Sequence, residues 1–110
     1  MTEKRKFPRT TVDLEGTLLV DGAHEETRVK VRNLGIGGLF LTANISLSFG
    51  AKVTVTIDFP APVGRLVFPA VVRWRDNDGT GLEFGLLGAK QTHAIAQLMR
   101  RRLPTGSAAR

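Results

Sequence analysis

Six short runs of alternating apolar and polar residues constrain the fold of this chain more than any other feature. Side chains of a β-strand point alternately to its two faces, so a period of two residues indicates a strand with one buried face. In residues 52–59, for example, Val53 and Val55 alternate with Thr54 and Thr56. The predicted strands are residues 11–20, 27–34, 38–42, 52–59, 65–74 and 81–86. Closely spaced strands with glycine and proline between them are typical of an antiparallel barrel or a sandwich.

The period changes to that of a helix only near the end of the chain. Apolar residues recur at helical spacing from Ile95 to Leu103, and Pro104 ends the predicted helix of residues 89–103. The arginines at 100–102 suit the negative end of the helix dipole, and we prefer this interpretation to a binding role for them. The fold class is therefore mainly β, with a C-terminal α-helix.

The run 65–74 holds two residues whose placement bears on the sheet. Pro69 cannot donate a hydrogen bond to a neighbouring strand, so it predicts an edge strand or a bulge. Trp74 belongs either to the core or to the edge of a ligand site, and we assign it to the core. The core is also predicted to hold the phenylalanines at 40, 49, 59, 68 and 84.

Positive charge is concentrated at the two ends of the chain. The net charge is +6, yet residues 11–99 hold eight basic and nine acidic side chains. We therefore divide the chain into a flexible basic arm (1–10), a domain of strands plus helix (11–103) and a disordered tail (104–110). Proteins that bind nucleic acid polymers usually spread positive charge over a face or groove, so a nucleic acid polymer is not expected as a partner.

The basic arm contains two arginines four residues apart. Arg5 and Arg9 flank Pro8, which keeps the segment out of a helix, and Lys4 and Lys6 add positive charge. Such a run is by default a solvated segment. Arginine can also bind a phosphate through two parallel hydrogen bonds, pair with the O6 and N7 atoms of guanine, and stack on a base.

A glycine-rich turn follows the second predicted strand. Gly35, Gly37 and Gly38 lie within four positions, directly after Asn33. The glycines alone are explained by positive backbone φ angles in a tight turn. Three of them beside an amide that can read a base edge also suit close approach of a ligand to the backbone.

Together these two segments resemble the motifs of the PilZ family, small bacterial receptors for cyclic di-GMP. The family pattern is Arg, three residues, Arg, then about two dozen residues later Asp or Asn, any residue, Ser, two residues, Gly. Arg5, Arg9, Asn33 and Gly38 match it, and Gly35 stands where the family has serine. Similar sequence surrounds the motifs at 37–41, 50–53, 71–74 and 81–84.

The resemblance implies a six-stranded antiparallel β-barrel with a C-terminal helix, formed by residues 4 to about 100. It also implies that cyclic di-GMP binds through Arg5, Arg9, Asn33, Gly35 and Gly38, with Lys4 and Lys6 adding charge. Binding would order the arm and change the surface that meets a protein effector. The alternative is an adaptor of the same fold that binds the nucleotide weakly or not at all. Such an adaptor would act through protein contacts, for example in motility or type IV pilus function.

The sequence shows no enzyme motif and no metal site. His24 and His93 have no cysteine or clustered carboxylates to complete a metal site, and no serine stands at a recognisable spacing from a histidine base. Residues 76–79 form a predicted β-turn rather than a calcium loop. The absence of cysteine, and of any apolar run near the roughly 20 residues of a membrane span, predicts a cytoplasmic protein without membrane insertion.

Overall fold

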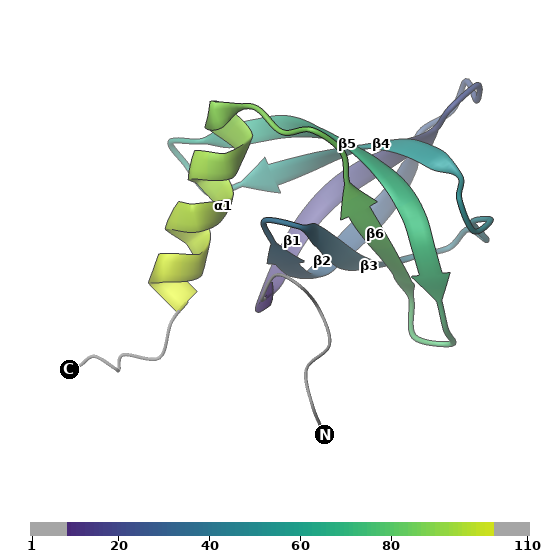
Figure 1. Cartoon of the computed structure of the whole chain (residues 1–110), viewed down its shortest axis with the longest axis horizontal. Coiled ribbons are helices and arrows are strands. Elements are labelled where there is room, and N and C mark those ends of the chain that lie inside the picture. The colour runs from purple at the N-terminus through teal and green to yellow at the C-terminus, as the bar shows by residue number, and fades with distance from the viewer. Residues whose placement is uncertain (1–8, 103–110) are drawn as a thin grey trace.

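The computed structural model describes residues 9–102, which form a closed antiparallel β-barrel and one helix (Figure 1). Around the barrel the strands follow the order β1-β2-β3-β6-β5-β4, so the predicted barrel is confirmed and the sandwich is not. The elements are β1 Arg9–Val20, β2 Thr27–Gly35, β3 Gly38–Ala43, β4 Lys52–Phe59, β5 Gly64–Arg75, β6 Thr80–Phe84 and α1 Ala89–Arg102.

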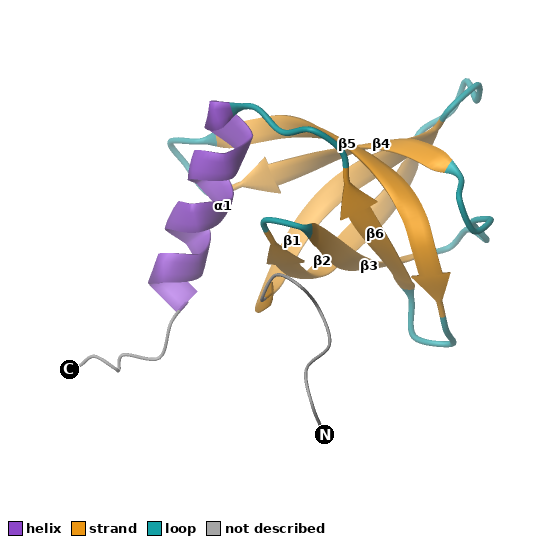
Figure 2. Ribbon diagram, in the orientation of Figure 1, coloured by secondary structure: helices purple, strands orange, loops and turns teal. Residues whose placement is uncertain are grey.

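The alternation in the sequence determines which side chains fill the barrel. In β4, Val53, Val55, Ile57 and Phe59 are at most 6% exposed, and the residues between them face outward. Helix α1 adds its buried Ala94, Ile95 and Leu98 to the same hydrophobic cluster. The barrel and the helix therefore share one core, and the helix lies across one side of the barrel (Figure 2).

The position of Pro69 differs from the prediction of an edge strand or a local bulge. Strand β5 pairs with β4 on one side and with β6 on the other, and its irregularity lies between Val72 and Trp74. The carbonyl of Pro69 accepts a hydrogen bond of 2.9 Å from the backbone N–H of Gly85, so its nitrogen faces the same side, just beyond the end of β6 at Phe84. No ladder donor is required there, which explains how proline fits inside a paired strand.

The phenylalanine predictions are confirmed for three residues and wrong for two. Phe59, Phe68 and Phe84 are buried, and Phe68 packs against both of the other rings. Phe40 is half-buried between the inward Leu39 and Leu41 of β3, so its ring faces outward. Phe49 is 72% exposed, because it lies in the loop between β3 and β4, outside the alternating pattern.

Strands β3 and β6 approach each other so closely that one position tolerates only glycine. A Cβ atom built on Gly38 would collide with the backbone carbonyl oxygen of Leu82. Gly38 pairs with Glu83 in this ladder, so relieving the collision would require moving backbone in two paired strands. The barrel itself therefore needs glycine at position 38.

Replacement of Gly38 by alanine should destabilise the fold by about 1–3 kcal/mol, the usual cost of overpacking. Urea unfolding followed by circular dichroism measures this loss. Gly85→Ala is the matched control, because its Cβ would lie 3.6 Å from the Pro69 ring, an ordinary contact. Equal stability of the Gly38→Ala and Gly85→Ala proteins would contradict the assigned backbone collision.

Candidate ligand-binding site

The β1–β2 ladder brings the two sequence motifs together. Arg9 is opposite Gly35 and Thr11 is opposite Asn33. The Nη1 atom of Arg9 donates a hydrogen bond to Oδ1 of Asn33 over 3.4 Å, between residues 24 positions apart in the chain. Both residues are half-buried. Lys4, Arg5 and Lys6 of the predicted site lie outside the described residues.

A bulge in β2 determines which side chains face outward beside Arg9. Pairing is regular at Val31 and again at Asn33, but the register shifts between them against both neighbouring strands. Val31 is fully buried, whereas Arg32 is exposed and Asn33 is half-buried. The bulge therefore places two consecutive polar side chains outside the barrel.

An aromatic pair continues the row of outward side chains from Asn33. Asn33 is paired with Phe40, Phe40 with Gly81, and Gly81 with Trp74, across strands β2, β3, β6 and β5. The rings of Phe40 and Trp74 are stacked, with centroids 5.2 Å apart and planes inclined by 22°. Trp74 is 41% exposed, so an aromatic surface lies in the same row as the Arg9–Asn33 contact.

The assignment of Trp74 to the core is therefore wrong. Val72 is fully buried, and the bulge between Val72 and Trp74 reverses the alternation, so the indole faces outward. The sequence contained one signal for this position: Gly81 and Gly79 stand in or beside the partner strand. A Cβ at Gly81 would collide with the indole, so this glycine leaves room for Trp74. A Cβ at Gly79 would collide first with the backbone carbonyl of Leu41 and would also lie 2.7 Å from the Phe40 ring.

The glycine-rich turn does not depend on left-handed backbone. Among residues 9–102, the glycines with positive φ are Gly22, Gly50 and Gly64. Gly35 and Gly38 are both buried members of strands, and the carbonyl of Gly37 accepts a hydrogen bond from Phe84 N–H at 2.9 Å. The explanation of this turn by positive φ angles is therefore wrong. Gly38 is needed for contact with β6, and Gly35 lies directly opposite Arg9.

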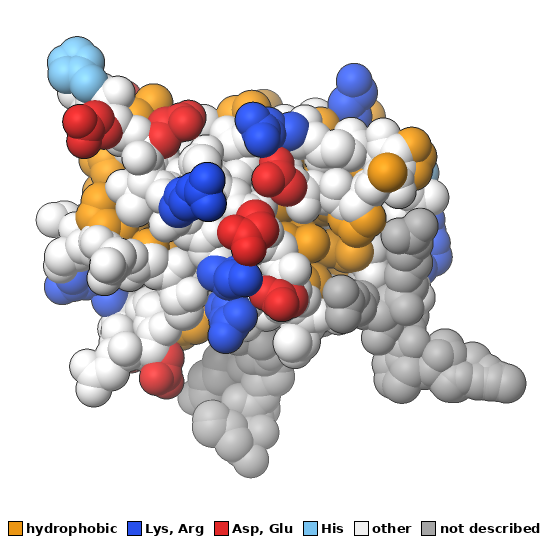
Figure 3. Space-filling view, turned by 180° about the vertical axis from the view of Figure 1, so that it is seen from behind, with side chains coloured by type: hydrophobic (Ala, Val, Ile, Leu, Met, Phe, Trp, Pro, Cys, Tyr) orange, Lys and Arg blue, Asp and Glu red, His pale blue; other side chains and the backbone are white. Residues whose placement is uncertain are grey.

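Ion pairs cover the outer face of β1 and β2 next to Asn33. Lys30 Nζ lies 3.0 Å from Glu15 and 3.5 Å from Asp13, and Nη1 of Arg32 also lies 3.5 Å from Asp13. The hydrogen bond to Glu15, together with the charge of Asp13, raises the pKa of Lys30 above its ordinary value. Acidic and basic side chains lie close together on the outer surface (Figure 3). Asp13 therefore contacts two cations, one of which adjoins the candidate site.

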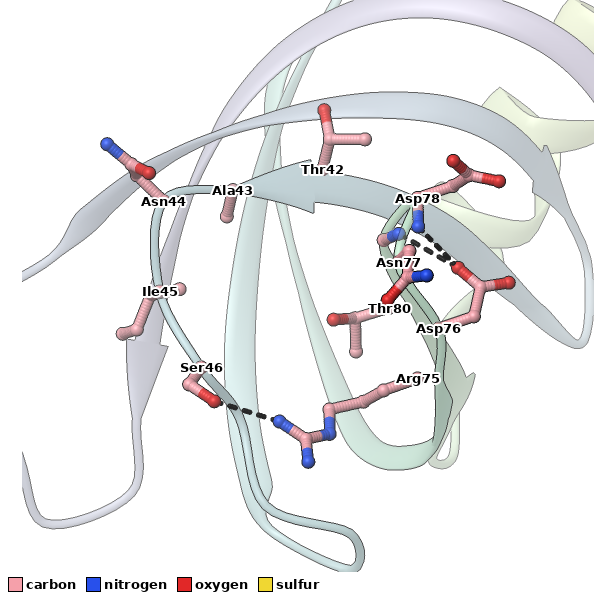
Figure 4. Close-up of a pocket in the computed structure, with 11 residues that line it drawn as sticks. Thr42, Ala43, Asn44, Ile45, Ser46, Arg75, Asp76, Asn77, Asp78 and Thr80 are labelled. Carbon is pink, nitrogen blue, oxygen red and sulfur yellow. Dashed lines mark hydrogen bonds between the residues drawn. The ribbon is translucent and has the colours of Figure 1, made fainter.

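A polar hollow of about 610 Å³ lies elsewhere, between the loop after β3 and the turn joining β5 to β6 (Figure 4). On one wall Arg75 donates a hydrogen bond of 2.8 Å to Ser46 Oγ. On another wall, Oδ1 of Asp76 accepts hydrogen bonds from the backbone N–H groups of Asp78 and Gly79, which stabilise the predicted turn. None of Arg9, Asn33, Gly35 or Gly38 lines this hollow. We place the candidate site at Arg9 and Asn33, where residues of the two sequence motifs are in contact.

Within residues 9–102, no group of three or more His, Asp or Glu side chains is arranged to hold a metal ion. The same part of the chain contains no helix that is long and apolar enough to cross a membrane.

Comparison with known proteins gives the family. The model of the PilZ domain matches residues 3–101, and the chain belongs to the PilZ domain family. A search of curated proteins gives no significant match. The family match confirms the resemblance seen in the two motifs.

Solved structures share the fold. The Bacillus subtilis inhibitor of motility (MotI/DgrA) is 26% identical with a TM-score of 0.72, over 93% of this chain and 52% of that one. The PilZ domain of YcgR from Escherichia coli, determined with c-di-GMP, is 14% identical with a TM-score of 0.72, over 97% and 100%. The MrkH–c-di-GMP complex of K. pneumonia is 14% identical with a TM-score of 0.71, over 98% and 55%. The chain thus spans about half the length of MotI and MrkH.

Proposed function

We propose that this protein is a binding module that senses cyclic di-GMP and presents an altered surface to a protein partner when the nucleotide binds. Membership of the PilZ family supports this proposal, since PilZ domains act as binding and effector modules. The YcgR domain and MrkH were solved with c-di-GMP, but at 14% identity they support only the shared fold. The choice of ligand therefore depends on the residues of the site.

The contact between Arg9 and Asn33 is the observation that carries the proposal. It unites the two halves of the family motif on one outer surface, through a hydrogen bond of 3.4 Å. The guanidinium of Arg9 suits a phosphate or the O6 and N7 atoms of guanine, and the amide of Asn33 can donate to and accept from a base edge. Cyclic di-GMP offers both groups in one molecule: two phosphodiesters and two guanines.

The aromatic pair gives the site a stacking surface. A base that stacks on an aromatic side chain gains about 1–3 kcal/mol, and Trp74 presents a partly exposed indole in the row that starts at Asn33. We include Trp74 and Phe40 in the binding surface together with Arg9, Asn33, Gly35 and Gly38. We assign Arg5 of the arm to phosphate and guanine contacts, as the motif implies, with Lys4 and Lys6 adding positive charge.

The output of the module is a change in the arm and in the surface around it. The arm leads into β1 at Arg9, the residue that contacts Asn33, so a ligand bound there is well placed to hold the residues before Arg9 against the barrel. The similarity to an inhibitor of motility makes motility the first process in which to search for the partner. We place the protein in the cytoplasm, as is typical of PilZ proteins.

Calorimetric titration with cyclic di-GMP tests the proposal, with Arg9→Lys as the informative variant. Lysine keeps the charge but loses the planar fork, so affinity should fall by about tenfold or more, as expected for the loss of a charge-assisted hydrogen bond of about 1.5–3 kcal/mol. Arg65→Lys is the matched control, because Arg65 is exposed and paired with Asp58 on other strands. It should bind as the parent does.

Two outcomes would contradict these assignments in different ways. If Arg9→Lys binds as tightly as the parent, the contact is only Coulombic and the role given to the guanidinium is wrong. If the parent releases no heat and shows no binding at high micromolar nucleotide, the receptor function fails and the adaptor function replaces it.

Gly35→Ser restores the hydroxyl that the family pattern has at this position. The backbone of Gly35 is not left-handed, so serine fits without φ strain. The hydroxyl should add one hydrogen bond to the nucleotide and tighten binding roughly threefold to tenfold. Calorimetry gives the affinity, and the melting temperature of the variant shows whether it is folded. Unchanged affinity of a stably folded Gly35→Ser protein would show that position 35 makes no polar contact with the ligand.

A further inference from the structure

Arg32 lies beside the proposed nucleotide site, although it belongs to neither sequence motif. It immediately precedes Asn33, and the bulge between Val31 and Asn33 turns both of their polar side chains outward. Its side chain is 51% exposed, so the guanidinium is accessible from solvent.

The outward residues of β1 place Asn33 between two arginines. Arg9, Thr11 and Asp13 are spaced two residues apart, and Thr11 is the residue opposite Asn33. Arg9 contacts Asn33 from one side of Thr11, and Arg32 extends to Asp13 on the other side. Outward positions on one strand are about 7 Å apart, so an anion above the small side chain of Thr11 is within reach of both guanidinium groups.

In the absence of ligand, Asp13 holds the guanidinium of Arg32. The closest atoms, Nη1 and Oδ1, are 3.5 Å apart, and the two side chains are 51% and 69% exposed. An ion pair this exposed contributes little to stability, so a phosphate can replace Asp13 at low cost. Asp13 is not left uncompensated by the exchange, because Lys30 also lies 3.5 Å from it.

We propose that Arg32 is a third arginine of the nucleotide site. When the ligand binds, the guanidinium of Arg32 breaks its ion pair with Asp13 and contacts a phosphate of the ligand instead. This inference rests on the proposed function, because it assigns Arg32 to the same phosphodiester ligand that Arg9 binds. Asp13 then competes with that phosphate for Arg32 and so weakens ligand binding. Arg32 raises the affinity for the ligand by direct contact. Asp13 lowers that affinity because its ion pair with Arg32 must break first.

Four variants titrated with cyclic di-GMP by calorimetry test the inference. Arg32→Gln should weaken binding by roughly tenfold, because a charge-assisted contact is lost. Its control, Arg65→Gln, removes the same charge from β5 and should change affinity by less than about twofold. Asp13→Asn should tighten binding by roughly threefold or more, because it frees Arg32. Glu15→Gln removes an equal charge from the same strand, at a residue paired with Lys30, so it should have a smaller effect.

Combined variants separate the proposed contact from general electrostatics. Asp13→Asn and Glu15→Gln are each added to the Arg32→Gln protein. If Asp13 acts through Arg32, Asp13→Asn should then tighten binding no more than Glu15→Gln does. The inference is overturned, with the proposed function intact, if the parent binds but Arg32→Gln matches Arg65→Gln, or if Asp13→Asn matches Glu15→Gln. Failure of the parent and of every variant to bind overturns both.

Discussion

The pairing of β1 with β2 is the constraint on which the rest of the site depends. It places Arg9 opposite Gly35 and Thr11 opposite Asn33, and it joins two motifs that are distant in the chain. A register error of one residue would turn Arg9 or Asn33 into the barrel. Buried alternating residues such as Leu14, Val29 and Val31 prevent that error, because any slip would expose them. The same hydrophobic effect that closes the barrel therefore positions the polar groups of the site.

Bulges add what regular strands cannot provide. The bulge before Asn33 exposes Arg32 and Asn33 together, and the one before Trp74 turns the indole outward against Phe40. Both lie on the outer face along one cross-strand row, so a polar contact and a stacking surface adjoin. Glycine at position 81 keeps the space that the indole occupies. The proposed binding surface thus lies on the outside of the barrel, while the interior is filled by side chains.

The sequence predicts the strands and the barrel well, because a period of two and the turn residues are local properties. It also predicts Arg9, Asn33 and Gly38 as site residues from the family spacing, and the structure brings Arg9 and Asn33 into contact. The sequence does not predict features that depend on how the strands pair. Trp74 follows a run of apolar residues that suggests the core, and only the partner strand reveals the bulge that exposes it. Pro69 suggests an edge, but its missing donor falls just beyond the end of β6. Arg32 lacks any motif and becomes relevant only when Asp13 and Asn33 are seen beside it.

Mapping of backbone amide chemical shifts by NMR during a titration with cyclic di-GMP tests the central claim most directly, since it locates the ligand without any substitution. The proposed site requires the largest changes at Arg9, Asn33 and Gly35 and at the indole N–H of Trp74. The amides of Asp58 and Arg65, on the ion-paired surface of β4 and β5, should change little. Changes concentrated in the turn from Asp76 to Thr80, or none at saturating nucleotide, would contradict a nucleotide site built on Arg9 and Asn33.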